Sequence, residues 1–288
     1  MVVKVKREYI FICITAMLLV SGIFAVPRGS IETSAENKTQ LPVVMYHQLT
    51  KNINRTGAYC ITLGQFENDL KFLQGKGYST INIEQLISHV RSGTPLPEKP
   101  IIITFDDGYE TVYSYAAPML KEYGMCAVAS VVGSFADMYT AANDHTLSYS
   151  YMTWDQITEL SKGSTIEIQN HSYDLHKTDK AGRHGAQKVS TESVSEYSAF
   201  LNEDIGRMQK LLTEKTGKRA TAFTYPFGSY SKESKQIIKA MGFDAAFVCE
   251  ERINLIDTED TEWLYRIGRY NRPHGMSSAE FFAKMGIG

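Results

Sequence analysis

Two shortages in the sequence exclude whole classes of protein. The 30 lysines and arginines nearly balance the 32 aspartates and glutamates, so the formal net charge is only −2. A chain with so little net charge has no strong field with which to hold nucleic acid or an anionic membrane surface non-specifically. The sequence also lacks a glycine-rich phosphate loop, which argues against a phosphoryl-transfer enzyme. We therefore expect no nucleic-acid partner.

Cysteine is scarce, and its placement excludes two further classes. Of the four cysteines, Cys13 lies in an apolar N-terminal run without the small-residue context of a lipid-attachment box. The other three are far apart and form no C-x-x-C pair. Cys126 and Cys249 fall in or beside apolar strand candidates, where cysteine is an ordinary core residue. We predict neither a disulfide framework nor a cysteine metal site.

Long apolar runs are also rare, and the one present lies at the N-terminus. It spans the 18 residues 9–26 and follows the basic residues Lys4, Lys6 and Arg7. A basic segment before an apolar run is typical of an export signal, and 18 residues also suffice for a short membrane anchor. Ala25 or Ala35 supplies a small residue for cleavage. We predict a signal peptide or anchor over 1–26, a polar linker over 27–40, and a secreted or membrane-anchored protein of the cell envelope, whose only membrane contact is this segment.

The remaining residues, 41–288, alternate between strand and helix patterns without an internal linker or repeat. Such alternation predicts an α/β fold with a parallel sheet and, at this length, a closed or nearly closed barrel in one catalytic domain. A capping box at Thr153 and Gln156 marks one helix start. We expect a polar loop over 136–150. The expected strands are 43–47, 79–81, 101–105, 127–132, 165–169, 222–225, 245–249 and 265–270, and the expected helices are 65–73, 83–91, 110–123, 154–160, 194–211, 231–241 and 277–285.

The strand 101–105 ends in two adjacent carboxylates, Asp106 and Asp107, followed by Gly108. The carboxyl ends of buried parallel strands are where α/β folds place their active sites. Because successive side chains on an extended segment point in different directions, one carboxylate can bind a metal while the other handles a proton. The alternative is a solvated turn, since aspartate and glycine are ordinary turn residues.

Two later segments also follow predicted strand ends. His171 and His176 lie on one loop, and with Asp107 they make a histidine–histidine–carboxylate set that leaves open positions for water and substrate. The segment 224–230, Thr-Tyr-Pro-Phe-Gly-Ser-Tyr, can shape a pocket floor and direct a backbone N–H at a developing oxyanion. The alternatives are a structural histidine pair and a plain aromatic-rich turn.

Together, these three segments resemble the motifs of the polysaccharide deacetylase family, which is also known as the NodB-homology domain or carbohydrate esterase family 4. The stretch 104–108 resembles the first motif, 171–176 the second and 225–228 the third. The histidine pair has one residue more than the commonest form. With Met45-Tyr46-His47 ahead of the first motif, it resembles the branch that contains poly-N-acetylglucosamine deacetylases. The resemblance covers about residues 42–282.

The resemblance implies a distorted (β/α) barrel and a divalent metal, most commonly zinc, with cobalt or manganese as substitutes. Asp107, His171 and His176 would be its ligands, and Asp106 the general base toward the activated water. The backbone N–H of Tyr225 would bind the oxyanion. The commoner third motif has an arginine where this chain has Thr224.

Two further catalytic residues must therefore come from elsewhere in the chain. We expect Arg269 to hold the base in place of the missing arginine. The late motif that supplies a general acid is not evident, and His274 is the nearest substitute. His47 is either a pocket residue or a buried structural histidine.

The implied activity is N-deacetylation of glycans that contain N-acetylglucosamine, such as peptidoglycan, chitin-like chains or poly-N-acetylglucosamine, by a monomer. An esterase that removes O-acetyl groups from xylan would use the same residues. An inactive glycan-binding module is the alternative from another class, although it would need no base beside a metal. Trp154 and Trp263 are more typical of core packing than of sugar stacking. We expect the remaining histidines to be solvated: His89, His145 and His184.

Overall fold

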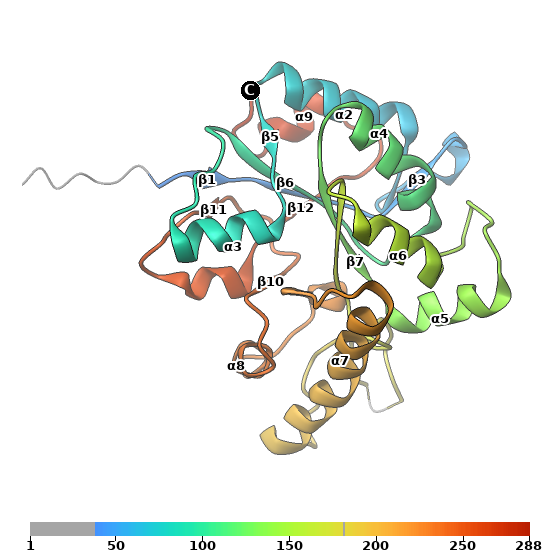
Figure 1. Ribbon diagram of the computed structural model, residues 1–288, viewed down its shortest axis with the longest axis vertical. Helices are drawn as coiled ribbons and strands as arrows, with labels where there is room; N and C mark the ends of the chain where they lie inside the picture. The colour runs from blue at the N-terminus through green and yellow to red at the C-terminus, as the bar shows by residue number, and fades with distance from the viewer. Residues whose placement is uncertain (1–37, 181) are drawn as a thin grey trace, which may run out of the picture. The chain divides into compact units, whose positions relative to one another are not determined.

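The computed structural model describes residues 38–180 and 182–288. Its main sheet has the strand order β10-β9-β8-β7-β6-β2-β12, and β5 pairs with the first residues of β6 beside this path (Figure 1). Every neighbouring pair in this sheet is parallel. The strands are β2 (Val43–Tyr46), β5 (Ser79–Thr80), β6 (Pro100–Phe105), β7 (Ala127–Val131), β8 (Ile166–Asn170), β9 (Ala222–Thr224), β10 (Ala245–Phe247) and β12 (Tyr270–Asn271).

Helices connect these strands, as the alternating pattern predicts. In Figure 1, α2 lies beside α9, and α7 lies beside α6 on another side of the sheet. The capping box at Thr153 and Gln156 is present at the start of α6. The α-helices are α2 (Leu63–Gly75), α3 (Ile83–Ser92), α4 (Ala117–Glu122), α5 (Gly133–Ala142), α6 (Trp154–Lys162), α7 (Val194–Thr216), α8 (Ser234–Ala240) and α9 (Ser278–Ala283).

Short elements complete the described chain. Two small sheets lie outside the main one: β1 (Gln40–Leu41) with β11 (Asn254–Leu255), and β3 (Gln48–Thr50) with β4 (Cys60–Thr62). A π-helical stretch, η2 (Val112–Ala116), leads into α4. The 3₁₀ turns are η1 (Ile53–Arg55), η3 (Pro226–Gly228) and η4 (Thr261–Arg266).

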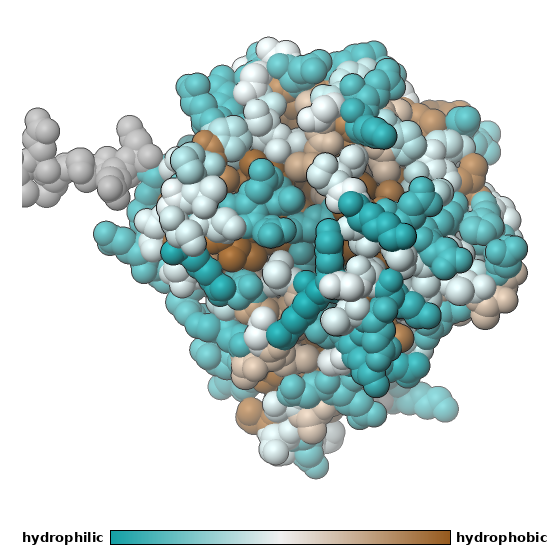
Figure 2. Space-filling view, viewed as in Figure 1, coloured by the Kyte–Doolittle hydropathy of each residue, from teal (hydrophilic) through white to brown (hydrophobic). Residues whose placement is uncertain are grey.

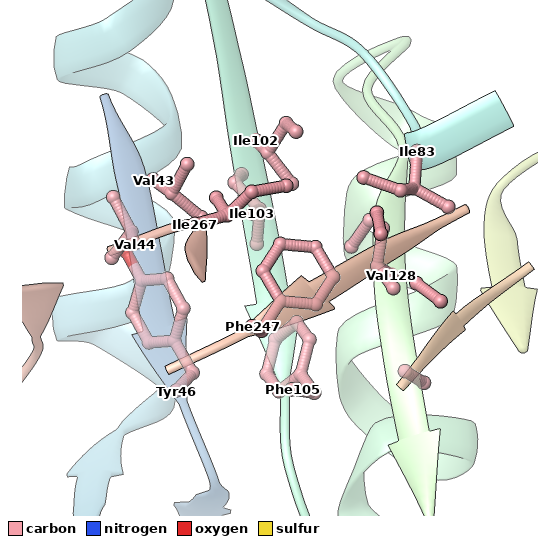
Figure 3. Packing of buried hydrophobic residues seen from close by; sticks show 14 of the residues in the cluster. Val43, Val44, Tyr46, Ile83, Ile102, Ile103, Phe105, Val128, Phe247 and Ile267 are labelled. Carbon is pink, nitrogen blue, oxygen red and sulfur yellow. The ribbon is translucent and has the colours of Figure 1, made fainter. Parts of the chain in front are cut away.

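The sheet closes into a distorted barrel through one short segment, residues 267–271. Ile267 pairs with Phe247 in a parallel bridge, and its N–H and C=O bond to Ala246 and Val248 at 2.9 and 3.0 Å. Three residues later, β12 pairs with β2. The segment therefore joins the two ends of the strand path, and the expected α/β barrel is confirmed. Phe247 and Ile267 pack with side chains of β2, β6 and β7 in the buried cluster (Figure 3).

A fully buried ion pair fastens α2 to the C-terminal segment. Arg272 donates to both oxygens of Asp69 at 2.8 and 3.0 Å, and neither side chain is exposed. The same carboxylate accepts hydrogen bonds from the hydroxyls of Tyr46 and Ser278 at 3.0 and 2.7 Å. A buried charge pair of this kind contributes stability only while all of its partners are present.

Three expectations about secondary structure need correction. Residues 136–142 of the expected polar loop belong to α5, which escapes a periodicity argument because only Gly133 and Ala136 are buried on it. The expected strand 265–270 is broken: residues 265–266 end the turn η4, Ile267 forms an isolated bridge, and β12 begins only at Tyr270. The expected helix 110–123 includes the π-helical stretch η2 before α4 begins.

The expected signal or anchor, 1–26, and most of the linker, 27–37, lie outside the described residues. Residues 38–40 already contact the folded unit, since Gln40 pairs with Leu255 and Lys38 forms an ion pair with Asp257. Within 38–180 and 182–288, no helix has both the length and the apolar character that a membrane crossing requires. On the face seen in Figure 2, hydrophobic residues show only in small patches between hydrophilic ones.

Candidate active site

The side chains of the site lie where the parallel strands end. Tyr46, the last residue of β2, pairs with Phe105, the last of β6, so His47 and Asp106 come next to each other. The N–H of Asp106 donates to Tyr46 C=O at 3.0 Å, which continues this register. His171 follows the end of β8, and Tyr225 follows the end of β9. Because all of these strands run in parallel, residues far apart in sequence meet at the end of the barrel where the strands have their carboxyl termini.

Asp107, His171 and His176 form a compact set of potential metal ligands. One ligand atom from each lies within 4.8 Å of the others. The Nε2 atoms of His171 and His176 lie 3.4 and 3.0 Å from Asp107 Oδ1, which is buried yet accepts no hydrogen bond from the described residues. Two imidazole nitrogens and a carboxylate oxygen around one point are donors that suit a divalent cation such as zinc. The three residues named from the sequence therefore fit a metal.

The surroundings prepare this set for a cation. Burial would raise the pKa of Asp107, but His171 and His176 outweigh it and hold that pKa far below its ordinary value. The Nδ1–H of His171 donates to Thr224 C=O at 2.8 Å, so Nε2, which faces Asp107, is the nitrogen that could bind a cation after losing its proton. Thr224, where the commoner motif has an arginine, thus contributes through its backbone.

Arg269 holds Asp106, as expected from the missing arginine. Its Nη1 and Nη2 donate to Asp106 Oδ1 and Oδ2 at 2.7 and 2.8 Å, and its Nε donates to Val248 C=O at 3.1 Å. The guanidinium is fully buried. Burial acts to raise the pKa of Asp106, but Arg269 and then His171 outweigh it, so the pKa lies below its ordinary value. Asp106 is therefore an oriented, ionised carboxylate at neutral pH.

The predicted oxyanion donor needs correction. The backbone N–H of Tyr225 already donates to Phe247 C=O at 3.2 Å, in continuation of the β9–β10 pairing. The N–H of Phe227, two residues later, has no acceptor among the described residues. Phe227 has a left-handed backbone (φ 59°), and its ring packs between those of His176 and His184, each 4.2 Å away between centroids. In this turn the N–H of Phe227, and not that of Tyr225, is without a hydrogen-bond acceptor among the described residues.

His47 and His274, the two histidines that the sequence left without a settled role, occupy different surroundings. His47 lies beside Asp106 in the strand register, its Nδ1 is buried, and no described residue bonds to that atom. Burial lowers its pKa, while Asp106 and Asp107 oppose that effect. The Nδ1 of His274 lies 2.8 Å from Gln65 Oε1, and the backbone N–H of His274 donates to Gly57 C=O. No contact joins His274 to the carboxylates or to the histidine pair in the described part of the chain.

His145 and His184 are exposed, as expected, although each also contacts a neighbouring residue. His184 stacks on Phe227, and His145 Nδ1 lies 3.4 Å from the buried carboxylate of Glu110. His89 Nδ1 contacts Thr94 C=O. No sequence signal marks the contacts of His184 and His145, because they join segments that only the fold brings together. Trp154 is buried and donates to Asp137, as expected for core packing.

Comparison with known proteins agrees with this geometry. The sequence model described as polysaccharide deacetylase matches residues 93–246, slightly more than half of the chain. The chain belongs to the polysaccharide deacetylase family. The matched region contains the first, second and third motifs, with Asp106, Asp107 and both histidines, but it ends before Arg269.

Relatives of this family member include poly-β-1,6-N-acetyl-D-glucosamine N-deacetylases. That of Escherichia coli (strain K12) is 28% identical over 219 residues, which are 70% of this chain and 32% of the relative. That of Staphylococcus aureus (strain N315) is 25% identical over 194 residues, 67% of this chain and 62% of the relative. The chain thus spans about a third of the first relative and less than two thirds of the second.

Solved structures of deacetylases share the fold. A deacetylase from Streptococcus pyogenes superposes with a TM-score of 0.68 at 18% identity, covering 86% of this chain and 99% of its own. A de-N-acetylase from Aggregatibacter actinomycetemcomitans gives the same TM-score at 24% identity, covering 84% and 99%. These likenesses confirm the fold class of this polysaccharide deacetylase family member.

Proposed function

We propose that the protein is an exported, metal-dependent hydrolase that removes N-acetyl groups from glycans of the poly-β-1,6-N-acetylglucosamine type. The observation that carries the proposal is that two adjacent aspartates, Asp106 and Asp107, contact different groups of side chains. Asp107 meets two histidines around one point, while Asp106 meets a buried arginine. The names of the relatives from E. coli and S. aureus support the amide over the ester as the bond broken. The basic and apolar segment before residue 27 supports export.

Asp107, His171 and His176 would hold the metal. When bound there, a divalent cation would lower the pKa of a water molecule and polarise the acetyl carbonyl. The metal would be zinc, cobalt or manganese. Two imidazole nitrogens and one carboxylate oxygen favour zinc among these.

The other residues divide the proton transfers between them. Asp106 accepts a proton from the attacking water, and the bidentate contact with Arg269 fixes the direction in which its lone pairs point. The N–H of Phe227 donates to the oxyanion that forms when water adds to the acetyl carbon. The C–N bond then breaks, the sugar nitrogen takes up a proton, and acetate and a free amine result. We assign the donation of that proton to His47.

The proposal is tested by acetate release from a set of glycans. Residues 38–288, which form one compact unit, are stripped of metal and reloaded with zinc, cobalt or manganese. Release is measured from poly-β-1,6-N-acetylglucosamine, chitooligosaccharides, peptidoglycan fragments and acetylated xylan. We expect metal-dependent release from the first. Release from xylan alone would make the protein an O-acetyl esterase, and metal binding without any release would favour a glycan-binding module.

The assignment of His47 leads to a paired prediction. We expect His47→Gln to lower kcat by about 100-fold, the range of a lost general acid, because this imidazole lies beside Asp106. His274→Gln should leave kcat near the wild-type value, since its ring contacts Gln65. Steady-state acetate release at saturating substrate measures both. The reverse pattern would return the role to His274.

A further inference from the structure

We propose that Asp204 is a positioning residue that sets the spacing of His171 and His176 for metal binding. The inference rests on the proposed metal site. Asp204 lies on α7, and its carboxylate accepts the backbone N–H of Tyr173 at 2.8 Å and that of Asp174 at 2.9 Å, with one oxygen for each. These two N–H groups lie in the middle of the loop that carries both histidine ligands.

The loop needs such a clamp because it has no regular structure of its own. Ser172, the residue after the first histidine, has a left-handed backbone with φ 75°, which a non-glycine residue adopts only when its surroundings hold it. The loop's own side chains supply one local bond, from Leu175 N–H to Ser172 Oγ at 3.1 Å. A carboxylate that bonds two successive N–H groups helps to fix the orientation of the peptide planes between the two ligands. The carbonyl groups of the same peptides, those of Ser172 and Tyr173, accept from the N–H groups of Gly133 and Ser134 at 3.1 and 2.7 Å.

Helix α7 also holds the start of this loop. Asn170 Nδ2 donates to Ile205 C=O and to Gln209 Oε1, both at 3.2 Å, and Asn170 Oδ1 accepts the N–H of Ser172 at 2.8 Å. One stretch of α7, 204–209, therefore bonds to the loop at two places. The helix itself is anchored in the core through a row of buried residues: Tyr197, Leu201, Ile205, Met208 and Leu212. It is a rigid support, so a change at Asp204 affects the loop without displacing the helix.

Metal affinity is the property that this clamp controls. Ligand atoms on a loose loop must be ordered when the cation binds, and the free energy of that ordering is subtracted from the affinity. Loss of an outer-shell partner typically weakens metal binding by about 10- to 100-fold. In Asp204→Asn one oxygen is replaced by an NH₂ group, which faces an N–H group and cannot accept from it.

The test uses the metal-free protein, residues 1–288, titrated with cobalt alone. Calorimetry and the visible absorption of bound Co²⁺ follow the binding. We expect Asp204→Asn and Asp204→Ser to weaken Co²⁺ binding by about 10- to 100-fold and to change the absorption spectrum. Glu203→Gln is the matched control, because it removes the same charge from the adjacent, exposed position of α7. This control should bind Co²⁺ as wild type does.

The outcomes separate this inference from the function on which it rests. Circular dichroism without metal identifies which variants are folded. A folded Asp204 variant with wild-type affinity and spectrum would overturn the role of Asp204 and leave the proposed function standing. Failure of the wild-type protein itself to bind Co²⁺ would overturn the metal site, and with it both proposals. Weak binding in the control as well would show a general charge effect and would also overturn the positioning role.

Discussion

Asp106→Asn is expected to reduce acetate release by at least about 1,000-fold, within the range that a lost general base costs. The amide has almost the shape of the carboxylate but cannot take a proton from water at neutral pH. Asp106 does not belong to the triad of Asp107, His171 and His176, so the variant should still bind a divalent cation. The measurement combines kcat from acetate release with metal affinity from calorimetry.

The same substitution also tests the bidentate contact with Arg269. Asparagine leaves the buried guanidinium without a counter-charge, so a lower melting temperature accompanies the loss of activity, and assays belong well below that temperature. Asp174→Asn is the control: it removes a partly exposed carboxylate near the histidines, and we expect its kcat to stay near wild type. If folded, metal-loaded Asp106→Asn kept a tenth of the wild-type kcat, Asp106 would not be the base.

Asp69→Asn is expected to produce the largest loss of stability. It leaves Arg272 buried without its counter-charge, which typically costs about 3–5 kcal/mol in the free energy of unfolding. For a domain of this size that corresponds to a fall of roughly 6–20 °C in Tm. Asparagine keeps only one of the two oxygens that accept the hydroxyls of Tyr46 and Ser278, so the loss includes one weakened hydrogen bond as well as the missing charge. Calorimetric or circular-dichroism melting measures it.

Two further variants identify the cause of the stability loss in Asp69→Asn. Lys71→Gln breaks an exposed ion pair with Glu67 on the same helix and should leave Tm unchanged. Asp69→Asn combined with Arg272→Met removes both charges and should recover part of the loss, because the unpaired charge is the main cost. If the double variant were less stable than Asp69→Asn alone, the destabilisation would come from lost packing around Arg272.

The parts of the site that lie at strand ends could be predicted from sequence. Asp106 follows a run of buried β-branched and aromatic residues, and His171 follows another strand, so the parallel fold itself requires that they meet. Arg269 could be inferred from an absence, since Thr224 stands where an arginine was expected. The capping box at Thr153 likewise follows from local hydrogen bonding, which needs no tertiary information.

What the sequence could not supply depends on contacts between distant segments. The N–H of Tyr225 was assigned to the oxyanion, but whether a backbone N–H is available depends on the partner strand, here on Phe247 C=O. Asp204 carries no motif, because its two acceptors matter only where α7 passes the histidine loop. The helix over 133–142 was missed because it buries too few side chains to show a period of 3.6 residues.

The closure of the barrel at residues 267–271 has a consequence for biosynthesis. Asp106 and its strand are synthesised 163 residues before Arg269, which holds this carboxylate. The pairing of Ile267 with Phe247 and of β12 with β2 brings that arginine into place. The Asp106 carboxylate of a nascent chain is therefore not held by Arg269 until residues 267–271 have docked, even if the strands before them have assembled. If Asp106 is the base, as proposed, completion of the barrel and acquisition of activity are one event.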